Sequence, residues 1–119
     1  MHTTEHLLRE ISAAWGRRDI ETLMSYVAPD CTYSASVGPE PGETFVGKDA
    51  VRTGFLKLLA HDSDGVSEPG EIRTIGDWAV FTWGFRKPAG DGYQVVRGCD
   101  LFQFRDGLVI RKDSYRKTT

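Results

Sequence analysis

Asp100 is the residue best placed, by its type and spacing, to do chemistry. Side chains alternate across a strand, so in the strand-like run 93–105 Asp100 shares one face with Phe102 and Phe104. A carboxyl group in an aromatic row loses water, which costs roughly a few kcal/mol and favours the protonated acid. We therefore expect a catalytic acid or hydrogen-bond donor here. The alternative is a structural acid near a strand end, in a salt bridge with one of three arginines: Arg97, Arg111 or Arg116.

Aromatic residues on a neighbouring predicted strand indicate what surrounds this acid. In the run 78–85, Phe81, Trp83 and Phe85 share one face because alternate side chains point the same way. Aromatic walls with a few polar groups are typical of small-molecule sites. Plain core packing explains such residues too, and for Phe81 and Phe102 it is at least as good an interpretation.

The last predicted strand carries charged residues on both faces. One face holds Lys112, Ser114 and Arg116. The opposite face is the more readily explained as solvated surface, because edge charges discourage association between sheets; its residues are Arg111, Asp113, Tyr115 and Lys117. A lysine or arginine at a pocket rim would suit an anionic or carbonyl-rich ligand, so a binding role stays open for Lys112 and Arg116.

Periodicity predicts the elements that must position these side chains. Apolar residues recur at helical spacing after a capping threonine at position 3 or 4, with the helix ending near Gly16. A second helix begins after the capping Asp19 and is expected to stop at Pro29, and a third covers 48–60. Strands are predicted over residues 31–37, 71–75, 78–85, 93–105 and 108–116. Asp106-Gly107, between the last two, is a strong hairpin signal.

This plan is an α+β fold in which three helices come first and an antiparallel meander follows. We expect the sheet to curve over the helices and enclose an apolar pocket. With 119 residues the chain is long enough for one core and too short for two ordinary domains, so residues 1–119 are predicted to be a single domain.

The order of elements and three segments resemble the nuclear-transport-factor-2-like superfamily, which includes ketosteroid isomerases, SnoaL-like polyketide cyclases and limonene epoxide hydrolase. The segments are GRRDIETLMSYVAPDCTY, FVGKDAVRTGFLKLL and RGCDLFQFRDGLVIRKDSYRK. They carry a G-x-x-D turn between the first two helices, F-x-G-x-D-A-V opening the third, and D-x-F-x-F-x-D-G in the penultimate hairpin. The resemblance spans nearly the whole chain and implies a cone-shaped α+β barrel. It defines the fold better than the activity, because this superfamily hosts many reactions.

Carried over residue by residue, the resemblance puts Asp100 where ketosteroid isomerases keep a protonated aspartic acid that donates to the developing oxyanion. Ala35 stands in place of their general base and Ile11 in place of their tyrosine, so steroid isomerisation by that route is not expected. Limonene epoxide hydrolases use an Asp-Arg-Asp arrangement, for which Arg97, Asp100 and Asp113 offer the residue types without a clear match in spacing. SnoaL-like cyclases are thought to need little more than an aspartate, which Asp100 supplies.

The resemblance also implies which side chains face the cavity and how the molecule assembles. Members of this fold often pair through the outer face of the sheet, so a homodimer is expected. Tyr33 could add a hydroxyl to the pocket, although half-buried packing would explain it as well. The expected cavity-facing set is Trp15, Tyr33, Phe55, Phe81, Trp83, Phe85, Phe102, Ser114 and Arg116.

Two functions remain open at this point. The first is a small cofactor-independent enzyme of the cyclase or isomerase type, in which Asp100 performs acid/base chemistry on an apolar carbonyl-bearing molecule. The second is a non-catalytic module of the same fold that binds a small molecule or a second subunit.

Composition and missing motifs argue against several other classes. A net charge of −2 supplies no attraction for nucleic acid or anionic membranes. Cys31 and Cys99 lack CxxC spacing and are expected to be reduced and buried, and the three histidines lack an acidic cluster, so no metal site is expected. No GxSxG, P-loop or GxGxxG motif occurs. Without a long apolar run or a signal-peptide pattern, a cytoplasmic location is expected.

Overall fold

The structure, a computed structural model, describes residues 3–39, 42–62 and 64–117. Helices and strands follow one another in the order α1 (Thr4–Arg17), α2 (Ile20–Ser25), β1 (Val27–Ser34), β2 (Thr44–Val46), α3 (Lys48–His61), β3 (Val66–Ile75), β4 (Trp78–Ala89), β5 (Gly92–Arg105) and β6 (Leu108–Arg116). Among these elements, the strands make one sheet in the order β2-β1-β6-β5-β4-β3. The α+β class with helices ahead of a curved sheet is confirmed.

The helix starts follow the predicted capping chemistry. Thr3 precedes α1 and its hydroxyl oxygen accepts from the backbone N–H of His6 at 3.0 Å. Asp19 caps α2, because its carboxylate accepts from the backbone N–H and the hydroxyl of Thr22 at 3.1 and 2.7 Å. Between the two helices Arg18 takes a left-handed conformation (φ 58°), which turns the chain sharply.

The junction between α2 and β1 differs from the prediction. We expected Pro29 to end the helix and the strand to begin at Cys31, but α2 ends at Ser25 and Pro29 lies inside β1. Pairing with β6 explains the earlier strand, because the carbonyl of Tyr26 already accepts from the N–H of Val109 at 2.7 Å. Proline has no N–H to offer, and it falls where the register of the β1–β6 pairing shifts.

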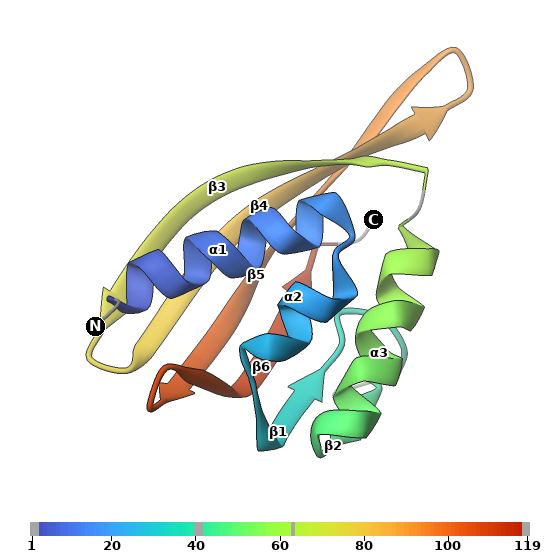
Figure 1. Cartoon of the computed structure of the whole chain (residues 1–119). Coiled ribbons are helices and arrows are strands. Elements are labelled where there is room, and N and C mark those ends of the chain that lie inside the picture. The colour runs from blue at the N-terminus through green and yellow to red at the C-terminus, as the bar shows by residue number, and fades with distance from the viewer. Residues whose placement is uncertain (1–2, 40–41, 63, 118–119) are drawn as a thin grey trace.

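The sheet is curved but does not close, since β2 and β3 are its two edges (Figure 1). All neighbouring strands run antiparallel except β1 and β6, which pair in parallel, for example Tyr33 opposite Lys112. The predicted meander accounts for β3 to β6 and did not foresee this parallel pair. In Figure 1, α1 crosses the concave side of the sheet over β3 and β4, and α3 lies against β1 and β2.

Turn chemistry sets the register of the last hairpin. Asp106 and Gly107 both have positive φ values, 53° and 80°, which is the geometry that a two-residue hairpin turn needs. At the other end of β5 the predicted loop from Pro88 to Gly92 is shorter, because β4 runs to Ala89 and β5 begins at Gly92. This hairpin extends beyond the rest of the sheet (Figure 1).

The core lies between the helices and the concave face of the sheet. Its helical side includes Leu8, Leu23 and Val51, each almost completely buried. Cys31 is buried in the same cluster as expected, whereas Cys99 is only half-buried; both are free thiols. The core extends from α2 and α3 to the inner side of α1, and a cavity adjoins it between α1 and the sheet.

Candidate functional site

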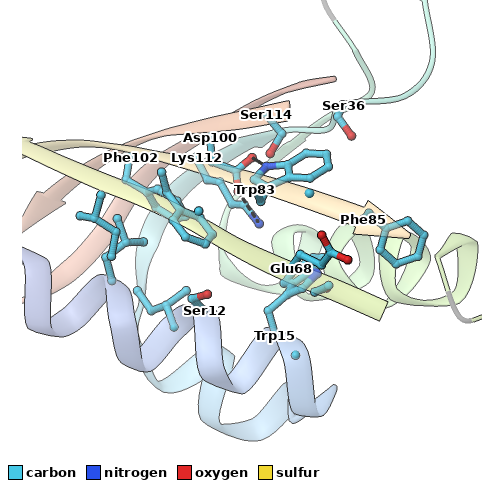
Figure 2. Close-up of a pocket in the computed structure, with 18 of the residues that line it drawn as sticks. Ser12, Trp15, Ser36, Glu68, Trp83, Phe85, Asp100, Phe102, Lys112 and Ser114 are labelled. Atoms are coloured by element: carbon cyan, nitrogen blue, oxygen red, sulfur yellow. Dashed lines mark hydrogen bonds and ion pairs between the residues drawn. The ribbon is translucent and has the colours of Figure 1, made fainter. Parts of the chain in front are cut away.

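A cavity of about 410 Å³ lies between α1 and the inner face of strands β3 to β6 (Figure 2). One wall comes from α1, through Ile11, Ser12 and Trp15. The opposite wall is the aromatic face of the sheet, on which Asp100 and Lys112 are the charged side chains deepest among the rings. A hollow of this size with a few convergent polar groups is typical of a small-molecule site.

Asp100 points into this cavity and is only 7% exposed. The β4–β5 register places it opposite Phe81, two residues from Trp83 along the neighbouring strand. The indole Nε1–H of Trp83 donates to Oδ1 of Asp100 at 3.0 Å. This bond fixes the orientation of the carboxyl group through Oδ1, and Oδ2 is the oxygen that faces Lys112.

Gly98 is what allows Trp83 to reach the acid. It lies opposite Trp83 in the sheet, and a Cβ atom at position 98 would come within 2.5 Å of the indole ring and would also meet the carbonyl of Tyr115. Real Cβ atoms do not make contacts this short. Because glycine has no side chain, the ring can lie across β5 and donate to Asp100.

Lys112, for which the sequence left a binding role open, is the second charged group of the inner wall, and it is buried. Its Nζ lies 4.0 Å from Oδ2 of Asp100, beyond hydrogen-bonding distance. Within the described part of the chain, Nζ makes no hydrogen bond. Four aromatic rings surround it at 3.9 to 5.7 Å from Nζ to the ring centroids: Trp15, Phe55, Tyr33 and Phe102. Burial lowers the pKa of Lys112, and the charge of Asp100 opposes that shift.

Arg116, four residues further along β6, has its hydrogen-bonding groups occupied. Its guanidinium donates to Oδ2 of Asp62 at 2.9 Å and to the Ser36 hydroxyl at 3.2 Å. The same group lies 5.5 Å from the centroid of the Trp83 ring. Arg116 therefore ties β6 to the residue after α3 and to the segment after β1, at one end of the cavity.

Tyr33 adds a buried hydroxyl near the acid. Burial raises its pKa well above the usual range, the nearby charge of Asp100 adds to this, and a hydrogen bond with Ser114 acts in the opposite direction. The Tyr33 hydroxyl is therefore neutral at any ordinary pH. Tyr33, Ser114 and Asp100 together form the polar part of the cavity wall.

Most of the predicted residues meet at this one cavity. Phe55 is the exception: α3 packs its apolar face on β1, and Phe55 makes edge contacts with Trp15 and Tyr33 from behind, with centroids 5.4 and 5.0 Å apart. Of the two substituted positions, Ile11 lines the cavity and Ala35 is buried in the core. The predicted residues that line the cavity are Trp15, Tyr33, Phe81, Trp83, Phe85, Asp100, Phe102, Ser114 and Arg116.

The salt-bridge alternative for Asp100 named the wrong partners. None of the three proposed arginines contacts it, and the nearest cation is Lys112. Alternation had already put Lys112 on the face of Ser114, but it gave no sign that this face is the inner one. Ser36 and Asp62 were missed altogether, because they lie in connecting segments with no recognisable pattern.

The described residues set limits on other sites. Among them, no group of three or more His, Cys, Asp or Glu side chains is arranged to hold a metal ion. No helix in this part of the chain is long and apolar enough to cross a membrane.

Comparisons with known structures agree with this architecture. A protein of unknown function with a cystatin-like fold from Xanthomonas campestris is 20% identical, with a TM-score of 0.82, over 98% of this chain and 92% of that chain. A nuclear-transport-factor-2-like protein of unknown function from Mesorhizobium loti is 23% identical, with a TM-score of 0.81, over 97% and 91%. TerC, crystallised with polyporic acid, is 20% identical, with a TM-score of 0.77, over 96% and 91%. At these identities the likeness establishes the fold.

The sequence comparisons are more specific about the family. Comparison with curated proteins gave no match. The family model of the SnoaL-like domain matches residues 8–112, which include most of α1, every strand except the end of β6, and both Asp100 and Lys112. This match covers most of the chain and agrees with the fold, so the chain belongs to the SnoaL-like domain family.

Proposed function

We propose that this protein is a small cofactor-independent enzyme that performs acid/base chemistry on an apolar, carbonyl-bearing molecule, as in a cyclase or isomerase. The observation that carries the proposal is the Asp100 carboxyl group, which is buried on an aromatic wall and open to a cavity of about 410 Å³. Carboxyl groups in such surroundings are the groups that enzymes use to move protons.

The neighbours of Asp100 favour a base as its first role. Trp83 donates a hydrogen bond to one oxygen, and the positive charge of Lys112 lies 4.0 Å from the other, so both neighbours favour a negatively charged acceptor. This differs from the protonated donor that the ketosteroid isomerase resemblance implies. In the proposed reaction Oδ2 removes a proton from the carbon next to the substrate carbonyl and then returns it.

The cavity fits one small organic molecule. Its volume is within the usual range for ligand sites, about 300–1,000 Å³. TerC, with the same fold, was crystallised with an organic acid, which supports a ligand of this general kind. Aromatic walls bind the apolar part of such a molecule and limit the access of water to the acid.

Proton exchange tests the proposal without knowledge of the natural substrate. We would incubate 2-tetralone with the protein in deuterated buffer and follow loss of the α-proton signals by NMR. Wild type should accelerate exchange, and Asp100→Asn should reduce the acceleration by about 10²- to 10⁴-fold, the usual contribution of a positioned acid or base. Asp91→Asn, at the exposed β4–β5 turn, is the matched control. A folded Asp100→Asn variant with the wild-type rate would reject the proposal.

A non-catalytic binding role is the second candidate, and the aromatic lining favours it because binding through these rings needs no titrating acid. In that case 2-tetralone would raise the melting temperature of wild type and Asp100→Asn equally, with no exchange in either.

We also propose that the partner is a second copy of this chain. The β4–β5 hairpin extends from the sheet and exposes Tyr93 and Val95, at 68% and 46%. Light scattering across micromolar concentrations should give a dimer mass, and Val95→Glu should shift it towards the monomer. A monomer mass for wild type throughout would reject this assembly.

A further inference from the structure

Lys112 has hydrogen-bonding capacity that the rest of the protein does not use. An ammonium group has three N–H donors, yet Nζ makes no hydrogen bond to any residue in the described ranges. Its side chain is only 7% exposed. Among the described residues, no fully buried side-chain nitrogen or oxygen lacks a hydrogen-bond partner, so Nζ itself is accessible from the cavity, where a ligand oxygen can accept from it.

The aromatic cage explains part of the arrangement. Ring faces attract the charge of an ammonium, and the Trp15 ring is the nearest, 3.9 Å from Nζ. They do not replace the directional oxygen acceptors that N–H groups ordinarily have. The rings enclose Nζ from the side of α1, α3 and β1, while Lys112 itself lines the cavity (Figure 2). The open approach to Nζ is therefore from the cavity.

The position of Asp100 shows what kind of atom belongs there. Its Oδ2 lies 4.0 Å from Nζ, so one ligand can meet both groups with adjacent atoms, an oxygen at the ammonium and a C–H at the carboxylate. We propose that Lys112 binds the carbonyl oxygen of the ligand and stabilises the negative charge that develops on it. The ligand class is then an enolisable ketone, or a phenol or enol that mimics its enolate. This inference rests on the proposed function.

The proton and electron movements balance without another reactant. The Asp100 carboxylate takes the proton of the C–H bond, and that bond's electron pair forms the carbon–carbon double bond of an enolate. The carbonyl π electrons move to oxygen, where the Lys112 ammonium holds them by a charge-assisted hydrogen bond. Return of the proton from Asp100 to the same carbon regenerates the ketone, and in a substrate whose enolate is conjugated with a further carbon–carbon double bond, return of the proton to the far end of that system completes an isomerisation. Lys112 keeps its own proton throughout.

The ionisation of bound 2-naphthol tests this role, because naphthol and naphtholate have different absorption spectra. Wild type should raise the ionised fraction of bound 2-naphthol above that in buffer at the same pH. Lys112→Met should weaken naphtholate binding by about 10- to 100-fold, as expected for loss of one charged hydrogen bond. Asp100→Asn should strengthen naphtholate binding, because this substitution removes the negative charge that faces the naphtholate oxygen.

Two further variants serve as controls, one for the loss of any lysine and one for a failure of Lys112→Met to fold. Lys57→Met removes an exposed lysine of α3 and should leave the naphthol spectrum unchanged. If Lys112→Met does not fold, the double variant Lys112→Met/Asp100→Asn is compared with Asp100→Asn alone, and should again bind naphtholate more weakly.

The outcomes separate this inference from the proposed function. An ionised fraction that does not depend on Lys112, or no binding of 2-naphthol to wild type, overturns the inference whatever the exchange rate of 2-tetralone. Lys112-dependent ionisation without tetralone exchange leaves the inference standing as ligand recognition, and rejects catalysis by Asp100.

Discussion

Lys112 and Arg116 lie on the same face of β6, four residues apart, and each is paired with an aspartate beside the cavity. The two pairs have different geometry. Arg116 meets Asp62 at 2.9 Å and also donates to Ser36. Lys112 is 4.0 Å from Asp100 and makes no hydrogen bond within the described residues.

This difference separates a structural ion pair from one that is available to a ligand. A guanidinium has donors in a fixed, planar arrangement, and in Arg116 they connect three segments of the chain. The Lys112 ammonium, by contrast, contacts ring faces and leaves its donors unused. Two cations in equivalent strand positions can therefore have different roles, decided by what the neighbouring elements offer them.

Breaking the Lys112–Asp100 pair on one side should have the largest effect on stability. Lys112→Met leaves a buried carboxylate without its nearest cation, and we expect a loss of about 3 kcal/mol in the free energy of unfolding, measured with urea. The double variant Lys112→Met/Asp100→Asn should come within about 1 kcal/mol of wild type, because the asparagine oxygen still accepts from Trp83 and no charge remains. Additive losses in the double variant would contradict the view that these charges depend on each other.

Breaking the second pair should cost less. Arg116→Met removes the donors to Asp62 and Ser36, but Asp62 is the more exposed acid and can recover water, so we expect a loss of about 1–2 kcal/mol. Arg111→Met, on the outer face of the same strand, is the control and should stay within about 0.5 kcal/mol of wild type. If Arg116→Met were more damaging than Lys112→Met, the comparison between the pairs would have to be reversed.

Local sequence signals were sufficient for much of the fold. Capping by Asp19 and the Asp106-Gly107 turn depend on residues a few positions apart, and both occur as predicted. Strand alternation likewise put Asp100 and Phe102 on one inward face. These features need no knowledge of which strand lies next to which.

The parts of the fold and of the site that the sequence did not predict depend on contacts between distant segments. The parallel pairing of β1 with β6 brings Tyr33 opposite Lys112, and no nearby residue signals it. That pairing, with α1 and α3 above it, surrounds Lys112 with rings from four different elements. The polar strand pattern alone gave no indication that Lys112 is buried; only the resemblance, which turned Ser114 and Arg116 of the same face toward the cavity, pointed that way. The salt bridge from Arg116 to Asp62 was not predicted either, because these two residues are far apart in the sequence.

The smallest expected effect is on the pH dependence of stability. It again distinguishes Lys112 from Arg116, through their different influence on the buried thiol of Cys31. Burial raises the pKa of Cys31 from 9.0 to about 11, and the charge of Lys112 partly opposes the shift. Because the folded pKa is the higher one, the stabilisation by Cys31 is complete below pH 9 and is lost as pH rises from 9 towards 11. Lys112 acts in the opposite direction: its folded pKa is lowered from 10.5, so its unfavourable contribution is relieved as pH rises towards that value.

The two trends partly cancel in wild type, and variants should separate them. Between pH 7.5 and 9.5 the contribution of Cys31 should fall by about 1 kcal/mol, so Cys31→Ala should remove that decrease from urea-measured stability. Lys112→Met should make this decrease in stability with pH steeper. The variant removes the opposing pH trend of Lys112, and it also removes the positive charge that limits the rise in the pKa of Cys31. Arg116→Met should leave the slope unchanged, since its guanidinium is not among the groups that shift Cys31. Equal slopes in the lysine and arginine variants would mean that Lys112 is not the cation coupled to the core.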